Sequence, residues 1–262
     1  MAGGAAMTDT TTNVPAYRRR VLASAPGLRV VLTWYSRHHA MAPHAHDVAQ
    51  HSFLLAGAME ETSRGQTQAV DSPGAGVKPA GCSHANRYGR NGALILCVEA
   101  DDDAGRSVGL SADDWIWRHD RVSPASLARI VRNSESAAEM AGELAAAAAP
   151  VARRYTTPPA WLTEIRERLR DAPNEIELDA EAGRAGVHRV HLTRAFTSHF
   201  GMTPSLFRQR ARLARATALL AEGRCGTEAA HAAGFADQSH LIRVMRRETG
   251  FTPGQLSGAL AG

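Results

Sequence analysis

The chain contains the stretch Thr227-Glu-Ala-Ala-His-Ala-Ala-Gly-Phe-Ala-Asp-Gln-Ser-His-Leu-Ile-Arg-Val-Met245. An earlier stretch repeats its pattern: Leu178-Asp-Ala-Glu-Ala-Gly-Arg-Ala-Gly186-Val-His-Arg-Val-His-Leu-Thr-Arg-Ala-Phe196. In each stretch we expect a short, alanine-rich helix to end at a glycine, Gly234 or Gly186. One apolar residue follows, and a second helix is expected within two or three positions. The sequence therefore predicts two copies of a helix, a tight glycine turn and a second helix.

The two glycines have a physical role in this pattern. A helix that ends and reverses sharply needs a residue with a positive φ, which glycine adopts without steric cost. Asp237 is expected to cap the last helix, because its side chain can accept a hydrogen bond from a free backbone amide. Small residues before each glycine let the two helices of a copy approach closely, namely Ala182, Gly183 and Ala185 in the first copy and Ala229, Ala230, Ala232 and Ala233 in the second.

The second helix of each copy is expected to have one buried and one polar face. Leu192 and Phe196, four residues apart, predict the buried face of a helix from about His188 to His199. The predicted contact residues for DNA are the outward ones: Arg189, Val190, Thr193, Arg194, Thr197, Gln238, Ser239, His240, Arg243 and Arg246. Arginine pairs with guanine, glutamine with adenine, and serine or threonine with base edges or phosphates. The pattern thus predicts two helices that enter a DNA major groove.

A long helix is expected to join the two copies. Thr203-Pro204 supplies a capping residue and a first-turn proline, and apolar residues follow at helical spacing. Its opposite face carries Arg208, Arg210, Arg212 and Arg215. From Gly186 to the C-terminus there are ten arginines and four acids, a net charge of +6, whereas the whole chain is +4. Such a concentration of positive charge indicates a phosphate-binding surface.

The stretch from about Trp161 to Leu260 resembles the DNA-binding domain of AraC/XylS-type transcription regulators. The most specific segment runs Ala233-Gly-Phe-Ala-Asp-Gln-Ser-His-Leu-Ile-Arg-Val-Met-Arg-Arg-Glu-Thr-Gly-Phe-Thr-Pro253, and the first copy ends in a parallel phrase, Phe200-Gly-Met-Thr-Pro204. The resemblance implies that DNA bases are contacted by Val190, Thr193 and Arg194 in one helix and by Gln238, Ser239, His240 and Arg243 in the other.

Four positions depart from this family's pattern. Glu181 stands where the first short helix usually buries an apolar residue, Gly226 and Ala229 replace larger aliphatic residues, and Met245 replaces phenylalanine. Glycine in a helix costs roughly 1 kcal/mol relative to alanine. The second copy is therefore expected to be loosely packed. The alternative for the whole region is a helical bundle whose arginine face is merely solvated.

A length of 262 residues predicts two domains of ordinary size. The three scattered cysteines include no CxxC pair, which favours reduced thiols in a cytoplasm. The first dozen residues have no apolar run, so no signal peptide is expected, and no stretch of eighteen apolar residues predicts a membrane span. The expected divisions are a disordered N-terminus over 1–16, a sensing and dimerisation domain over 17–150, a linker over 151–160 and a DNA-binding domain over 161–262.

Residues 17–100 are expected to form short β-strands. Leu28-Arg-Val-Val-Leu-Thr-Trp-Tyr35 is rich in β-branched and aromatic residues, and Ser52–Leu55 and Ala93–Val98 are further apolar runs. Turn signals such as Asp71-Ser-Pro-Gly-Ala-Gly76 separate them, which is typical of a sandwich or barrel. Ser123-Pro124 then predicts a helix start, and an alanine-rich helix is expected from Ser136 to Ala149. This second helix is either low-complexity sequence without a role or a dimerisation helix.

Two short histidine motifs lie in the β region. One reads His44-x-His46-x₃-Gln50-x₆-Gly57, and the other reads Pro79-x-Gly81-x₂-His84-x-Asn86. They resemble the paired motifs of the cupin β-barrel, and the resemblance implies that His44, His46, Gln50 and His84 line one pocket. Residues i and i+2 of a strand face the same side, so His44 and His46 can both point inward. Imidazoles with one oxygen ligand suit a divalent metal such as Zn, Mn, Fe or Ni.

The oxygen ligand would be the neutral amide of Gln50, which binds a divalent metal more weakly than a carboxylate. Two interpretations therefore stay open: one divalent metal in the barrel, or an inherited, metal-free scaffold that is hydrogen-bonded internally. The predicted fold class is α+β with two domains, a cupin-like N-terminal β-barrel and an all-α C-terminal domain whose two helix-turn-helix units are joined by a long helix.

The function predicted from these features is that of a cytoplasmic, nucleoid-associated transcription regulator and not an enzyme. Its expected partners are double-stranded DNA, a small-molecule effector and a second copy of itself, with RNA polymerase as a further candidate and no membrane. Activator and repressor are not distinguished. The alternatives are a cupin metal enzyme or a ligand-binding protein that carries a non-essential helical module; against an enzyme, the sequence has no phosphate loop, dinucleotide fingerprint or nucleophile-base pair.

Overall fold

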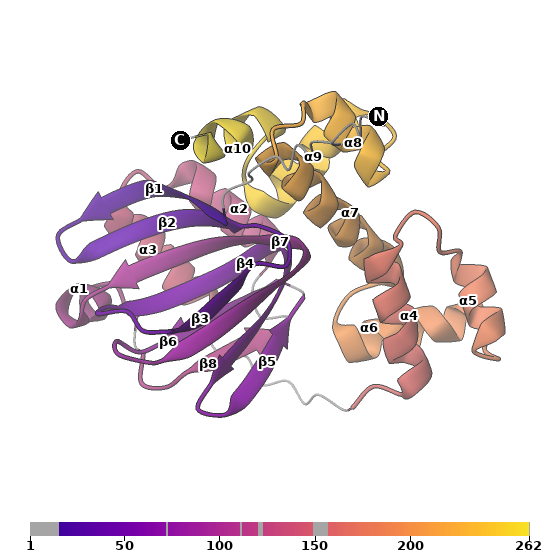
Figure 1. The fold of residues 1–262 in the computed structure, drawn as a ribbon, viewed down its shortest axis with the longest axis horizontal. Coiled ribbons are helices and arrows are strands. Elements are labelled where there is room, and N and C mark those ends of the chain that lie inside the picture. Colours follow the sequence, from indigo (N-terminus) through magenta and orange to yellow (C-terminus); the bar gives the residue numbers. More distant parts are fainter. Residues whose placement is uncertain (1–15, 72, 111, 120–122, 149–156, 262) are drawn as a thin grey trace, which may run out of the picture.

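A computed structural model describes residues 16–71, 73–110, 112–119, 123–148 and 157–261. It has an antiparallel β-sheet in the N-terminal part and helices in the C-terminal part (Figure 1). The α+β architecture, with an N-terminal β domain and a C-terminal helical domain, is confirmed. The expected N-terminal disorder over 1–16 lies outside the described residues except for residue 16. Of the expected linker over 151–160, residues 151–156 lie outside them, and Ala160 already belongs to helix α4.

The sheet has eight strands, all paired antiparallel. The central path is β1-β2-β7-β4-β6-β8, while β3 pairs with β7 and β5 pairs with β4. Their bounds are β1 Tyr17–Ala25, β2 Leu28–Tyr35, β3 Ala40–His44, β4 Ala49–Ser63, β5 Gln66–Val70, β6 Gly74–Lys78, β7 His84–Ala100 and β8 Ile116–His119. The strand predicted at 28–35 is β2, and the other two predicted runs are parts of β4 and β7.

Two glycines let the long strands β4 and β7 bend. Gly57 has a φ of +94° and Gly92 a φ of +64°. A Cβ at Gly57 would lie 2.1 Å from the carbonyl oxygen of Gly92, and one at Gly92 would lie 2.1 Å from that of Tyr35. The β4–β7 register shifts next to Gly57. Glycine is needed at both positions, because the backbones approach closely and φ is left-handed. The bend lets each long strand pair with different neighbours along its two halves.

Three helices follow β7 within the N-terminal part: α1 Asp102–Ser107, α2 Pro124–Asn133 and α3 Ala137–Ala147. Helix α2 begins after Ser123 with proline in its first turn, as predicted. The apolar side chains of Leu127, Ile130 and Leu144 are fully buried in this chain. A dimer formed through α2 and α3 would therefore have to use their outer faces.

The C-terminal helices are α4 Ala160–Asp171, α5 Leu178–Arg184, α6 Arg189–Phe200, α7 Pro204–Ala221, α8 Gly226–Ala233, α9 Gln238–Thr249 and α10 Pro253–Leu260. Two helix-turn-helix copies, α5–α6 and α8–α9, are joined by the long helix α7, as predicted. Gly186 and Gly234 have φ values of +66° and +85°, so both turn glycines adopt the expected left-handed backbone.

One apolar core runs through the sheet and the second copy. Leu32 and Leu96 of the sheet belong to the same cluster of buried side chains as Leu220 of α7 and Leu241 and Met245 of α9. Helix α2 packs on α9, and the carbonyl oxygen of Arg246 accepts a hydrogen bond from Arg132. The expectation of loose packing in the second copy is wrong, because Ala229 and Met245 are completely buried against these neighbours.

The first copy has a separate core. Its buried residues come from α4 to α6 and the start of α7, including Leu162, Leu192, Phe196 and Phe207. Glu181, the charged residue at an expected apolar position, is 1% exposed and accepts hydrogen bonds from Arg168 Nε at 2.9 Å and Arg184 Nη1 at 2.7 Å. Two arginines thus compensate the buried carboxylate, as a buried charge requires.

Within the described residues, no helix has the length and apolar composition that a membrane crossing requires. The three cysteines are unpaired, with Cys82 and Cys97 buried and Cys225 exposed.

A buried ion pair lies inside the curved N-terminal sheet, which we call the barrel. The side chain of Glu61 is fully buried and accepts hydrogen bonds from Lys78 Nζ at 2.9 Å and Asn86 Nδ2 at 2.9 Å. The indole N–H groups of Trp115 and Trp117 also donate to it. Lys78 is the single lysine of the chain. Four donors that lie between 17 and 56 residues from Glu61 in sequence therefore converge on one carboxylate.

Removing one partner of this pair should strongly destabilise the protein. We expect Glu61→Gln or Lys78→Met to lower the free energy of unfolding by about 3–5 kcal/mol, because each leaves an uncompensated buried charge. Urea unfolding followed by tryptophan fluorescence measures the change. The matched control is Asp114→Asn, which breaks the exposed Arg64–Asp114 pair of 2.9 Å and should cost less than about 1 kcal/mol. Equal losses in the two variants would contradict the importance of the buried pair.

The same carboxylate should make stability depend on pH. Burial alone raises the pKa of Glu61, but the charge of Lys78 and the hydrogen bonds outweigh it and lower the pKa from 4.5 to about 2. A depressed pKa stabilises the folded state above pH 4.5, and this contribution is lost as the pH falls towards 2. Between pH 5 and pH 3 the wild type should therefore lose more unfolding free energy than Glu61→Gln.

Candidate DNA interface and barrel cavity

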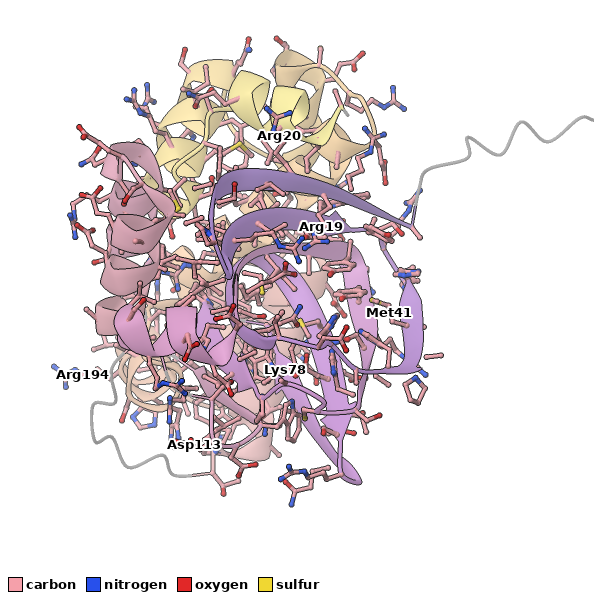
Figure 2. All side chains as sticks on the ribbon, turned by 90° about the vertical axis from the view of Figure 1, so that its left-hand side faces the viewer. Arg19, Arg20, Met41, Lys78, Asp113 and Arg194 are labelled. Atoms are coloured by element: carbon pink, nitrogen blue, oxygen red, sulfur yellow. The ribbon has the colours of Figure 1, made fainter. Side chains whose placement is uncertain are left out.

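The outer face of α6 is exposed at four of the five predicted positions. Arg189, Val190, Arg194 and Thr197 are exposed, and Thr193 is half-buried. His188 caps the helix, its Nδ1 accepting from the amide of Val190 at 3.2 Å. Arg189 is held by an ion pair of 2.6 Å with Asp179. No ion-pair partner of Arg194 occurs among the described residues, and that side chain projects from the edge of the molecule (Figure 2).

The outer face of α9 is likewise open. Gln238, Ser239, Arg243 and Arg246 are exposed, and His240 is half-buried with its ring edge-on to Phe235. The Asp237 carboxylate accepts from the amide of His240 at 2.7 Å, so the predicted N-cap is confirmed. Where the structure describes the chain, Arg243 and Arg246 have no ion-pair partner.

The structure gives a local reason for glycine at position 226, which the sequence pattern did not reveal. A Cβ at this position would lie 2.7 Å from Nε2 of Gln238. The amide oxygen of Gln238 accepts a hydrogen bond from Thr227 Oγ1 at 3.0 Å. The glycine thus leaves room for the first exposed side chain of α9 to lie over the start of α8.

The arginines of α7 divide between two environments. Arg208 and Arg212 border a shallow surface cavity with Phe235 and His240, beside the beginning of α9. Burial, and then the charge of Arg208, lowers the pKa of Arg212. Arg210 points elsewhere and donates to Glu248 Oε2 at 3.2 Å. The basic face of α7 is therefore narrower than the sequence suggested.

The barrel encloses a cavity of about 200 Å³. Arg19, Met41 and Lys78, from β1, β3 and β6, lie around it (Figure 2). Three of the four predicted ligands come together there: the ring nitrogens of His44, His46 and His84 all lie within 4.8 Å of one another. The pairing of β3 with β7 places His44 opposite His84.

Backbone hydrogen bonds orient two of these imidazoles. Nδ1 of His44 lies 2.9 Å from the carbonyl oxygen of Ala42, and Nδ1 of His84 lies 3.0 Å from that of Cys82. When Nδ1 donates, Nε2 is left as the acceptor for a metal. Burial, and then the charge of Lys78, lowers the pKa of His84 to about 4 and also lowers the pKa of His46, which keeps both rings neutral.

Gln50, the fourth predicted ligand, lines the same cavity as the three histidines. Its Nε2 donates to Glu99 Oε1 at 3.3 Å. Glu99 in turn pairs with Arg19 at 2.6 Å and with Arg29 at 3.2 Å. The amide is thus fixed by a polar network on the cavity wall.

Sequence reasoning missed two charged groups of the cavity, the Glu61–Lys78 pair and the Glu99 network. A signal was present for the first, since one lysine in a chain with 30 basic residues is unusual and lies in a strand segment. No local pattern identifies Glu61 as its partner, because the two residues meet only through folding.

A family model described as a helix-turn-helix domain matches residues 182–258, which include the end of α5, all of α6 to α9 and most of α10. No curated protein sequence matches the chain. The matched region contains every predicted DNA-contacting residue.

Solved structures similar to the chain are distant. KdgF from Halomonas sp. is 23% identical with a TM-score of 0.31, covering 34% of this chain and 84% of that one. ToxT from Vibrio cholerae is 12% identical with a TM-score of 0.38, covering 90% of this chain and 100% of that one. A conserved protein of unknown function from Streptococcus pyogenes is 22% identical with a TM-score of 0.30, covering 38% and 90%.

The geometry of α5 to α9 and the family match agree with each other and with the sequence pattern. The C-terminal part of this chain contains a helix-turn-helix domain over residues 182–258.

Proposed function

We propose that the protein is a sequence-specific, DNA-binding transcription regulator whose N-terminal barrel senses a small molecule or a metal. One observation carries the proposal: α6 and α9 each present an exposed polar face, while their opposite faces are fixed in apolar cores. Helices held in this way can enter a major groove without losing their position.

Base reading is proposed for the exposed residues of the two helices. Arg194 and Arg243 are the strongest candidates, since each is exposed, and unpaired guanidinium groups are suited to bidentate pairing with guanine. Arg189 is engaged with Asp179 and would have to leave that carboxylate to reach DNA. The two bound DNA segments should lie about one helical turn, ~10 base pairs, apart.

Phosphate binding is proposed for the basic face of α7. Arg208, Arg212 and Arg215 recur at helical spacing on one side, and Arg208 and Arg212 flank His240 of α9. Contacts of this kind position a protein on DNA without reading sequence.

The barrel residues fit a divalent metal. Three imidazoles converge, and two of them have Nδ1 bonded to a backbone carbonyl, which is the usual outer support of a metal-binding histidine. His44, His46 and His84 would hold the ion, with Gln50 beside them on the wall. A bound metal would supply a Lewis-acidic centre to which an oxygen of an effector can coordinate.

Neither proposed role requires catalysis, so we place the protein among regulators and not among enzymes. We also propose that it works in the cytoplasm as a homodimer. The outer faces of the sheet and of α2 and α3 are the candidate surfaces.

Substitutions of Arg194, Arg243 and Arg215 should separate base reading from phosphate binding. We expect Arg194→Ala and Arg243→Ala each to weaken binding to a selected DNA site by roughly 1–3 kcal/mol and to relax base choice at one position. Arg215→Gln should instead weaken specific and random DNA alike and reduce the salt dependence by about one phosphate contact. Fluorescence anisotropy on a site selected from genomic fragments provides the measurement.

Arg106→Ala is the matched control, because this residue lies on α1 in an exposed pair with Asp103. It should leave DNA binding unchanged. Equal losses on specific and random DNA for Arg194→Ala would contradict base reading by that side chain.

Metal binding should stabilise the protein through the histidines. At a Zn²⁺ concentration of 100 Kd, mass action adds about 2.7 kcal/mol to the free energy of unfolding, which raises Tm. We expect His44→Ala and His84→Ala to abolish this shift, and His38→Asn to retain it. His38 is exposed and has a φ of +56°, which asparagine tolerates. A Zn²⁺-induced rise in Tm that survives in both alanine variants would exclude the three-histidine cluster as the metal site. Mn²⁺, Fe²⁺ and Ni²⁺ are tested in the same way.

A further inference from the structure

The turn glycines of the two helix-turn-helix copies lie in different surroundings. Both have a left-handed backbone, with φ values of +66° for Gly186 and +85° for Gly234. Among the described residues, a Cβ at Gly186 would have no atom within 4 Å beyond its own chain neighbours, whereas a Cβ at Gly234 would lie 2.0 Å from Oδ1 and 2.4 Å from Cγ of Asn174. The second turn is therefore covered by a side chain for which only glycine leaves room.

Asn174 reaches this turn from the first copy. It lies between α4 and α5, which both contribute buried side chains to the separate core of that copy. Its Oδ1 accepts a hydrogen bond from Nε of Arg212 at 2.8 Å, and Nη2 of Arg212 donates to the carbonyl oxygen of Pro173 at 3.3 Å. This segment of the first copy is thus bound to the middle of α7 and packs against the second copy at the same time.

Helix α7 also connects the two copies. Phe207, near its start, belongs to the core of the first copy, and Leu213, further along, belongs to the core that includes the second copy. Long helices bend, so a single helix does not by itself fix how its two ends are oriented. Arg210 adds a hydrogen bond to Glu248 of α9, but it is part of α7. The contact of Asn174 with the second turn lies beside the helix, so it opposes rotation of one copy relative to the other.

We propose that Asn174 is a positioning residue that fixes the orientation of α6 relative to α9 and thereby selects the spacing between the two halves of a DNA site. This inference rests on the proposed DNA-binding function, in which the two helices read adjacent segments of the major groove. Asn174 acts through the turn at Gly234 and through the side chain of Arg212, and it needs no contact with DNA.

The geometry of B-DNA explains why orientation controls spacing. One turn contains about 10.5 base pairs, so one added base pair moves half of a site by about 3.4 Å along the axis and rotates it by roughly 34°. Two helices in a fixed orientation cannot both follow this change, and one of them loses contacts. Two helices that rotate relative to each other retain their contacts at several spacings. The difference in affinity between spacings therefore measures how firmly the two copies are held.

The test measures this difference with the full chain and fluorescence anisotropy. A site selected from genomic fragments is compared with the same site after one base pair is added or removed between its halves. We expect the wild type to bind the altered sites about tenfold more weakly, and Asn174→Ala to reduce this ratio of affinities to about threefold or less. Asn174→Asp retains the shape of the side chain and an acceptor for Arg212, so it should retain the wild-type ratio.

Glu175→Ala is the matched control, because Glu175 is the next residue after Asn174 and is also exposed. It should leave the ratio of affinities unchanged. A second pair of variants tests the contact from the other side. Gly186→Ala and Gly234→Ala impose the same kind of left-handed strain, but only the second displaces Asn174. Only Gly234→Ala should therefore lower the ratio.

A measurement without DNA separates this inference from the proposed function. Spin labels on the exposed Cys225 and on Ser198→Cys of α6 report the distance between the copies by electron double resonance, while Cys82 and Cys97 are buried. We expect Asn174→Ala to broaden the distance distribution and Asn174→Asp to leave it unchanged. An unchanged distribution or an unchanged ratio in Asn174→Ala would overturn the inference, as would wild-type binding that ignores spacing. Broadening in a protein that binds no DNA would contradict the proposed function and leave the positioning role of Asn174 standing.

Discussion

Burial of the second helix-turn-helix copy against the β-sheet is the interaction on which the arrangement of the molecule depends. Side chains of β2, β7, α2, α7 and α9 belong to one apolar core. Hydrophobic burial of this kind is non-directional and grows with area, so a shared core fixes two elements more firmly than scattered polar contacts do. The face of α9 that points to solvent is consequently set by the sheet as much as by the helices of its own domain.

The first copy stands in a different relation to the sheet. Its core is closed by α4 to α6 and Phe207, and ion pairs of Arg166 and Arg170 with Asp71 connect α4 to the barrel. Partly exposed ion pairs contribute little net stability, because charges lose hydration when they pair. Of the two helices proposed to read DNA, α9 therefore shares a core with the sheet, α6 belongs to a separate core, and α7 connects the two.

The interior of the barrel is polar but balanced. Glu61 is matched by Lys78 and three neutral donors, and Glu99 by two arginines and Gln50. His46 and His84, whose pKa values are lowered mainly by burial, line the same cavity. A metal or effector that enters the cavity would meet charged groups that are already paired with one another. Its own charge would therefore have to be balanced by the groups that ligate it and not by a free carboxylate.

The sequence by itself determined the features that depend on neighbouring residues. It located both turn glycines, the N-cap positions Ser123, Thr203 and Asp237 and the strand at 28–35, because caps, turns and strand patterns are short-range. The strand alternation expected for His44 and His46 is wrong, because β3 ends at His44. The tertiary structure alone decided which side chains meet across long separations. It paired Glu61 with Lys78, turned Arg210 inward to Glu248, neutralised Glu181 with Arg168, and packed Met245 against the sheet. These outcomes arise from burial shared between distant segments, and a pattern within one helix or strand contains no information about the partner that covers it.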